Sequence, residues 1–173
     1  LAHAGWSRKD HPGSDSSDHG WGSGVGSFGI QIAKLYNCPV IATASPDKLD
    51  KCIELGADYA VDHRKDDWHK EVRNITKEIA KSTGVAPGID VSFDHIGETH
   101  FNQQLTLLKY GGTLVTCGAT TGYDAKIDLR HIFFKGTNVI GSTQGTRAEL
   151  EQGPPAGCQG AGKQRELPPQ HPP

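Results

Sequence analysis

The chain has 173 residues, a length that suits one domain with tails. Its 18 basic and 20 acidic side chains nearly balance, which gives no argument for a nucleic-acid partner or an anionic membrane surface. No apolar run approaches the roughly 18–20 residues needed to span a bilayer, and four scattered cysteines without a CxxC pair support neither a disulfide framework nor a zinc cage. We therefore expect reduced thiols and a cytoplasmic protein.

From Gly22 onward, short apolar runs alternate with amphipathic runs. Apolar residues at helical spacing, together with capping residues, predict helices at 27–36, 45–56, 66–82, 98–109 and 128–135. Short runs typical of buried strands lie at 39–44, 57–63, 88–97, 111–118 and 137–143. The alternation predicts an α/β fold, a Rossmann-type doubly wound parallel sheet with helices on both faces. No strand is recognisable before the first helix, so we expect the sheet to lack its first, central strand.

A glycine-rich turn, GWGSGVG (20–26), stands directly before the first predicted helix. It partly matches GxGxxG, the pattern in which glycines let the backbone approach a pyrophosphate at a helix N-terminus. By this mechanism the turn is a candidate phosphate cradle. The candidate cofactor-binding residues in it are Gly22, Ser23, Gly24, Val25 and Gly26.

The run GSGVGSFGIQIAKLYNCPVIATASPDKLDKCIELGADYAVDHR closely resembles the coenzyme domain of medium-chain dehydrogenase/reductases. The nearest look-alikes are zinc-type alcohol dehydrogenases and their quinone and enoyl reductase relatives. Further matches in order and spacing are VSFDHIG, LLKYGGTLVTCGATTG and NVIGSTQGTRAEL. The resemblance covers about residues 20–151 and implies hydride transfer between a nicotinamide cofactor and a carbonyl or an activated alkene.

The same resemblance implies that the catalytic domain, with its catalytic zinc ligands and most of the substrate pocket, is not in this chain. We therefore assign no catalytic residue and no metal ligand, and we expect the isolated chain to be catalytically inactive. The expected partners are a nicotinamide dinucleotide and, in a full-length relative, a small-molecule substrate. The edge of the sheet offers a surface for a homo-oligomer.

The residues after the second predicted strand favour NADP(H). An acidic residue there would bind the adenosine ribose and favour NAD, but Ser45 and Lys48 offer a hydroxyl and an ammonium that can receive a 2′-phosphate. NAD(H) stays open, because Ser45 can be a helix cap, Lys48 a solvated charge, and Asp47 lies between them. By resemblance, His63 stands where related reductases often carry a Tyr near this pocket, with Arg64 as another phosphate partner.

The resemblance also implies which strand ends line the nicotinamide half of the cleft. The residues it suggests beside the ribose and nicotinamide are Asp94, Ile96, Gly118, Ala119, Ser142 and Thr143. Each has an ordinary alternative role, as a helix cap, a turn residue or a loop hydroxyl. His95 is expected to be structural, and Cys117 a small buried residue.

Both ends lose the family pattern abruptly. The expected organisation is an irregular segment at 1–19, a dinucleotide-binding domain at 20–151 and a disordered Pro/Gly-rich tail at 152–173. The absence of methionine indicates a fragment or a processed product, and the lost pattern suggests reading-frame errors, with divergent tails as the alternative. Loss of a central strand predicts low stability. The rival functions are a non-catalytic dinucleotide-binding module and a non-functional product.

Overall fold

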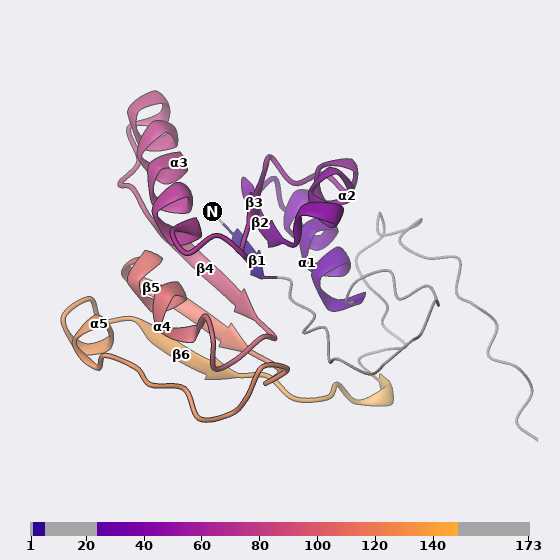
Figure 1. Ribbon diagram of the computed structural model, residues 1–173, viewed down its shortest axis with the longest axis vertical. Coiled ribbons are helices and arrows are strands. Elements are labelled where there is room, and N and C mark those ends of the chain that lie inside the picture. The colour runs from indigo at the N-terminus through magenta and orange to yellow at the C-terminus, as the bar shows by residue number, and fades with distance from the viewer. Residues whose placement is uncertain (1, 6–23, 149–173) are drawn as a thin grey trace, which may run out of the picture.

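The computed structural model describes residues 2–5 and 24–148. These residues form a six-stranded sheet with helices on both faces (Figure 1). The strands are β1 (Ala2–Gly5), β2 (Val40–Ala44), β3 (Tyr59–Asp62), β4 (Ile89–Asp94), β5 (Leu108–Thr116) and β6 (Asn138–Gly141). All neighbouring strands are parallel, in the order β3-β2-β1-β4-β5-β6. This order confirms the predicted Rossmann-type doubly wound fold.

The helical elements lie close to their predicted positions. They are α1 (Gly24–Leu35), the 3-10 turn η1 (Pro46–Lys48), α2 (Leu49–Glu54), α3 (Trp68–Thr83), α4 (Phe101–Leu107) and α5 (Arg130–Phe133). The predicted helix at 45–56 is divided into η1 and α2, and the predicted helix at 98–109 is shorter because β5 already begins at Leu108. Within the described part of the chain, no helix is long and apolar enough to cross a membrane.

The centre of the sheet differs from the prediction. β1 lies between β2 and β4 and pairs with both, with Ala4 opposite Ala42 on one side and Phe93 on the other. We expected these residues in an irregular segment and the central strand to be missing, and this part of the prediction is wrong. The four residues of β1 are too few to show a strand pattern of their own. Their strand conformation comes from backbone groups that bond two neighbouring strands, which almost any side chain permits.

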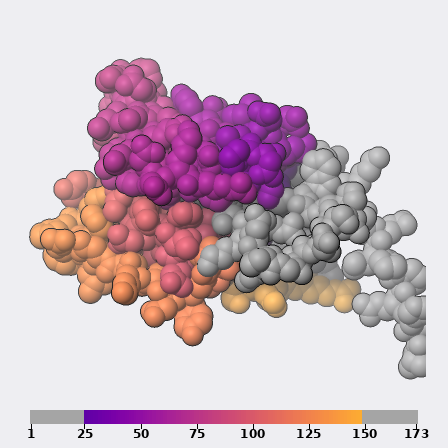
Figure 2. Space-filling model, viewed as in Figure 1, coloured from indigo at the N-terminus to yellow at the C-terminus, as the bar shows by residue number. Residues whose placement is uncertain are grey.

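Two cores lie on opposite faces of the sheet. α1 and α2 cover one face, where Ile30 and Cys52 pack with Val40, Ala42 and Ala44. α3 and α4 cover the other face, with a core described by its buried apolar members Ile41, Val61, Trp68, Val72, Ile89, Leu105, Leu107, Leu108 and Leu114. Alternate residues of β2 therefore face opposite cores, as expected for a strand covered on both sides. In the space-filling view, the purple and magenta first half of the chain lies against the salmon and orange second half (Figure 2).

Candidate functional site

The carboxyl ends of the parallel strands meet along one edge of the sheet, which we call the carboxyl edge. It passes the last residues of the strands, Gly5, Ala44, Asp62, Asp94, Thr116 and Gly141. The predicted site residues that directly follow a strand end here are Ser45, His63, Ile96, Gly118, Ala119, Ser142 and Thr143. The fold therefore brings together residues that are far apart in the sequence, at the edge where parallel sheets bind ligands.

The remaining predicted residues belong to helical turns or lie outside the described residues. Gly24, Val25 and Gly26 begin α1, and Lys48 ends η1. Gly22 and Ser23 fall outside the described residues, as do most of the irregular segment predicted at 1–19 and the tail predicted at 152–173. For all of these residues, contact with a cofactor stays a prediction.

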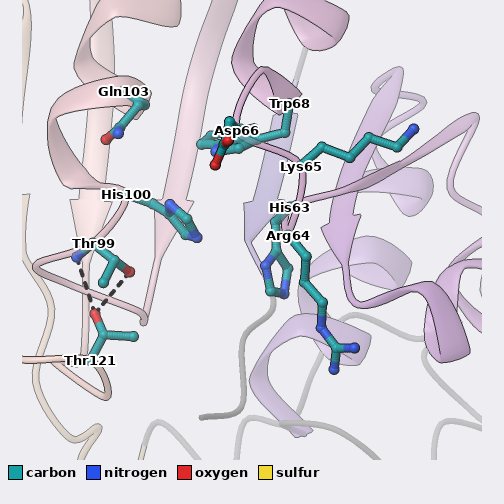
Figure 3. Close-up of a pocket in the computed structure, with 9 residues that line it drawn as sticks. All are labelled: His63, Arg64, Lys65, Asp66, Trp68, Thr99, His100, Gln103 and Thr121. Atoms are coloured by element: carbon teal, nitrogen blue, oxygen red, sulfur yellow. Dashed lines mark hydrogen bonds between the residues drawn. The ribbon is translucent and has the colours of Figure 1, made fainter.

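A pocket of about 410 Å³ lies between the loop after β3 and the loop after β4 (Figure 3). It is lined by His63, Arg64, Lys65, Asp66, Trp68, Thr99, His100, Gln103 and Thr121. Of these residues, His63 and Arg64 were predicted from the sequence to lie near the cofactor phosphate. The other members were missed because they come from the loops after β3, β4 and β5 and from the first turns of α3 and α4, which only tertiary packing brings together. The signal available in the sequence was that all three loops follow parallel strands.

Two histidines and a tryptophan form an aromatic cluster in this pocket. The His100 ring extends towards the His63 ring, with 5.6 Å between their centroids, and the Trp68 ring lies 5.3 Å from His100 in an edge-on arrangement (Figure 3). His63 is only 8% exposed. Burial lowers the pKa of His63, and the charges of Arg64 and Lys48 add to this effect. Burial, followed by the neighbouring His63, also lowers the pKa of His100.

A second polar group lies where β2 and β3 end. Ser45 makes no side-chain capping bond to the helical turn that follows it. Instead, a hydrogen bond from Ser45 lowers the pKa of Asp47, and Lys48 and Arg64 lower it further. Arg64 Nη2 lies 4.0 Å from Asp47 Oδ1. The residues predicted to receive a 2′-phosphate therefore already surround a carboxylate, with which a phosphate would have to compete.

Asp94 has a role in the turn after β4 that the sequence did not indicate. Its side chain is fully buried (0% exposed). Its Oδ1 accepts hydrogen bonds from the amides of Ile96 (3.2 Å) and Gly97 (3.3 Å) and from Nε2 of Gln104 (2.7 Å), while its Oδ2 accepts one from Oγ1 of Thr116 (3.1 Å). The carboxylate therefore holds the turn together and joins it to β5. A ribose could reach the carboxylate only if this turn opened.

The loops after β4 and β5 are tightly interlocked. Thr121 donates its amide hydrogen to the carbonyl of Ile96 (2.8 Å), and the Thr120 hydroxyl donates to the carbonyl of His95 (2.9 Å). Gly97 has φ +85°, and a Cβ there would lie 2.6 Å from the carbonyl oxygen of Gly122. Only glycine tolerates both this conformation and this close approach. The two loops therefore present one preformed surface at the carboxyl edge.

His95 and Cys117, for which we expected structural roles, differ in how exposed they are. His95 is buried in the turn after β4, whereas Cys117, which we expected to be buried, is exposed. The reason is that β5 ends at Thr116, so Cys117 already belongs to the following loop. Partial desolvation and then the Asp94 carboxylate raise the pKa of the Cys117 thiol, which keeps it protonated at neutral pH rather than activated as a nucleophile.

The donor set of the described residues does not suit a zinc site. Residues 2–5 and 24–148 contain no group of three or more His, Cys, Asp or Glu side chains that could hold a metal ion. A catalytic zinc needs three such protein ligands.

Comparisons with known proteins give matches to one family of dehydrogenases and reductases. Residues 24–154 match the family model described as zinc-binding dehydrogenase. Crotonyl-CoA reductase from Streptomyces collinus is 31% identical over 135 residues, which cover 70% of this chain and 30% of that protein. The chain thus spans about a third of the length of the curated relatives it matches.

Two solved structures share the fold. An NAD-dependent alcohol dehydrogenase is 35% identical with a TM-score of 0.65, covering 74% of this chain and 35% of the other. The 2-octenoyl-CoA carboxylase reductase in complex with NADP and 2-octenoyl-CoA is 26% identical with a TM-score of 0.61, covering 75% of this chain and 32% of the other. Similar proteins therefore include ones named for either dinucleotide.

Proposed function

The chain belongs to the zinc-binding dehydrogenase family, and on that premise we propose that it is the coenzyme-binding part of an NADP(H)-dependent oxidoreductase. In the complete enzyme, a hydride would pass between the nicotinamide and a carbonyl or an activated alkene. The nicotinamide supplies this hydride chemistry, while the protein binds and orients the cofactor. The isolated chain is proposed to bind dinucleotide without turnover, because it spans about a third of the relatives it matches and the family resemblance implies that most of the substrate pocket belongs to another domain.

The observation that carries the proposal is the convergence of the candidate residues along the carboxyl edge. Backbone amides in the first turn of α1, at Gly24–Gly26, would receive the pyrophosphate. The adenosine half would lie by the ends of β2 and β3, next to Ser45 and His63. The nicotinamide half would lie by the interlocked loops after β4 and β5 and by the exposed loop after β6. We assign residues 20–151 and strand β1 to this domain.

The charges near the end of β2 favour NADP(H) over NAD(H). β2 ends at Ala44 and is followed by Ser45, so no carboxylate stands at the position that binds the ribose hydroxyls in NAD-dependent proteins. Lys48 and Arg64 supply positive charge nearby, as their effects on His63 and Asp47 indicate. Asp47 opposes a phosphate, so we expect a moderate preference rather than an absolute one.

The experiment is a fluorescence titration of the full chain with NADPH and with NADH. We expect saturable binding of both and tighter binding of NADPH. Lys48→Gln should weaken NADPH binding tenfold or more, because a hydrogen bond to a charged group contributes about 1.5–3 kcal/mol, and should leave NADH binding nearly unchanged. Lys51→Gln is the matched control, since Lys51 lies on α2 and pairs with Glu54. Absence of saturable binding for both dinucleotides would refute the proposed function.

A further inference from the structure

Two imidazole nitrogens in the pocket have no hydrogen-bond partner within residues 2–5 and 24–148. Nε2 of His63 and Nδ1 of His100 are buried, and neither has a partner among the residues that the structure describes. Both rings line the same pocket, one on each of its two loops. Buried polar atoms without partners are uncommon in folded proteins and call for a specific explanation. A ligand that brings hydrogen-bond acceptors into the pocket would provide one.

Charges of both signs surround the two rings, and the cations available to an anionic ligand are Arg64, Lys65 and Lys48. His63 lies between Asp62 and Arg64 in the chain, and both affect its pKa. Lys65 and Asp66, on the same loop, also line the pocket. The charge of Lys48, on η1, acts on His63 as well. His100 faces His63 across the pocket, and the negative charge of Asp94, at the end of β4, raises the pKa of His100. Without a ligand, burial lowers the pKa of both imidazoles, and Arg64 and Lys48 lower that of His63 further, so both rings are mainly neutral at pH 7.

We propose that His63 and His100 together recognise a phosphate monoester and take up a proton as it binds. This inference rests on the proposed function, in which the phosphate is the 2′-phosphate of NADP(H). The phosphate oxygens would accept hydrogen bonds from N–H groups of the pair, and their negative charge would stabilise one imidazolium. The proton comes from solvent. Because the rings are only 5.6 Å apart, the pair takes up one proton rather than two.

The direction of the pH effect follows from this uptake. Bound phosphate raises the pKa of the pair above its lowered value in the free chain, so affinity increases as pH falls between these two values. The increase approaches about tenfold per pH unit for one proton. The phosphate itself takes up a proton below about pH 6, which weakens its binding as pH falls. The pH range above this value therefore reports on the histidine pair. NADH lacks the 2′-phosphate, and its affinity should not change over that range.

The test measures NADPH and NADH affinities of the full chain at about pH 6.5, 7.5 and 8.5. Calorimetry in two buffers of different ionisation enthalpy counts the protons taken up. We expect NADPH affinity to fall with rising pH, with uptake of up to one proton, and NADH affinity to stay level. Equal pH dependence for the two dinucleotides would overturn the inference.

Variants assign the effect to the pair. The double substitution His63→Gln and His100→Gln should abolish the pH dependence of NADPH binding, and His63→Tyr should permit binding without it, since a phenol does not titrate in this range. His69→Gln is the control: His69 Nδ1 is also buried without a described partner, but the residue does not line the pocket. A pH dependence that persists in the double variant would contradict the inference.

The failure of the proposed function can be distinguished from the failure of this inference. Adenosine 2′-phosphate and inorganic phosphate are titrated in the same buffers. If neither dinucleotide binds but either phosphate binds with proton uptake, the proposed function fails and the phosphate site stands. If the dinucleotides bind while no ligand bearing a phosphate monoester takes up a proton, the proposed function stands and this inference is refuted.

Discussion

At the level of single residues, the strongest constraint on the candidate site is the buried carboxylate of Asp94. It accepts four hydrogen bonds from the turn after β4, from α4 and from β5. Gln104, whose Nε2 is one of the donors, is itself held by the hydroxyl of Ser92 at 2.7 Å. Asp94, which we expected to contact the ribose, thus supports the loop surface on which a cofactor would lie. Such networks are costly to break because each member would leave a buried group unpaired.

Asp94→Asn should therefore destabilise the chain. The amide replaces one accepting oxygen with a donor that faces other donors, and we expect a loss of about 1–3 kcal/mol. Chemical denaturation monitored by circular dichroism measures it. Asp90→Asn is the matched control on the same strand, because Asp90 is exposed and pairs with Lys109 at 2.9 Å; exposed pairs contribute at most about 1 kcal/mol. Equal effects of the two substitutions would show that the Asp94 network contributes little.

At the level of elements, β1 gives the sheet its continuity. It bonds β2 on one side and β4 on the other, and so joins the two halves of the doubly wound fold. Our expectation of low stability rested on the loss of this strand. With β1 in its central position, that reason is removed, and we expect the chain to unfold in one cooperative transition.

Ala4→Pro tests the position of β1. In a central strand, each amide hydrogen bonds one of the two neighbours, and proline removes this donor and adds a ring that a central strand does not accommodate. We expect a loss of about 2–3 kcal/mol, measured as a lower midpoint of thermal unfolding. Ala4→Ser, which keeps the amide hydrogen, serves as the control. A midpoint for the proline variant that matches the wild type would place β1 outside the stable sheet.

At the level of the whole molecule, β6 forms one edge of the sheet (Figure 1). All four of its residues are exposed, including Val139 (42%) and Ile140 (51%). Near it, the exposed rings of Phe133 and Phe134 lie 4.5 Å apart on α5 and the residue after it. An exposed apolar edge strand is a template for pairing with another chain. The homo-oligomer that we expected at the edge of the sheet would therefore form through β6.

Ile140→Lys should reduce this association. A lysine on an edge strand opposes strand pairing through its charge, so we expect the wild type to sediment as a dimer and the variant as a monomer at the same concentration. Analytical ultracentrifugation measures both. Val85→Lys is the control, since Val85 is equally apolar and exposed but lies in the loop before β4. A monomeric wild type, or a dimer in both variants, would argue against association through β6.

Local sequence patterns were sufficient to predict the elements after the glycine turn and the doubly wound fold. Apolar periodicity, caps and turn glycines act over a few neighbouring residues, and the order of strands in such folds follows from short connections. The positions of His63 and Gly118 at the carboxyl edge were predicted from the resemblance to medium-chain dehydrogenase/reductases, in agreement with the rule that parallel sheets bind ligands at their carboxyl ends. What the sequence determined was therefore which segments are strands or helices and which strand ends meet.

Only the tertiary structure decided how individual side chains use those positions. The strand character of β1 depends on backbone bonds to two neighbours, and the approach of His100 to His63 depends on two loops brought together by α3 and α4. The burial of Asp94 and the exposure of Cys117 likewise depend on where β4 and β5 end relative to the helices. Burial and pairing are properties of contacts between distant segments, and a single sequence does not encode them in any local pattern.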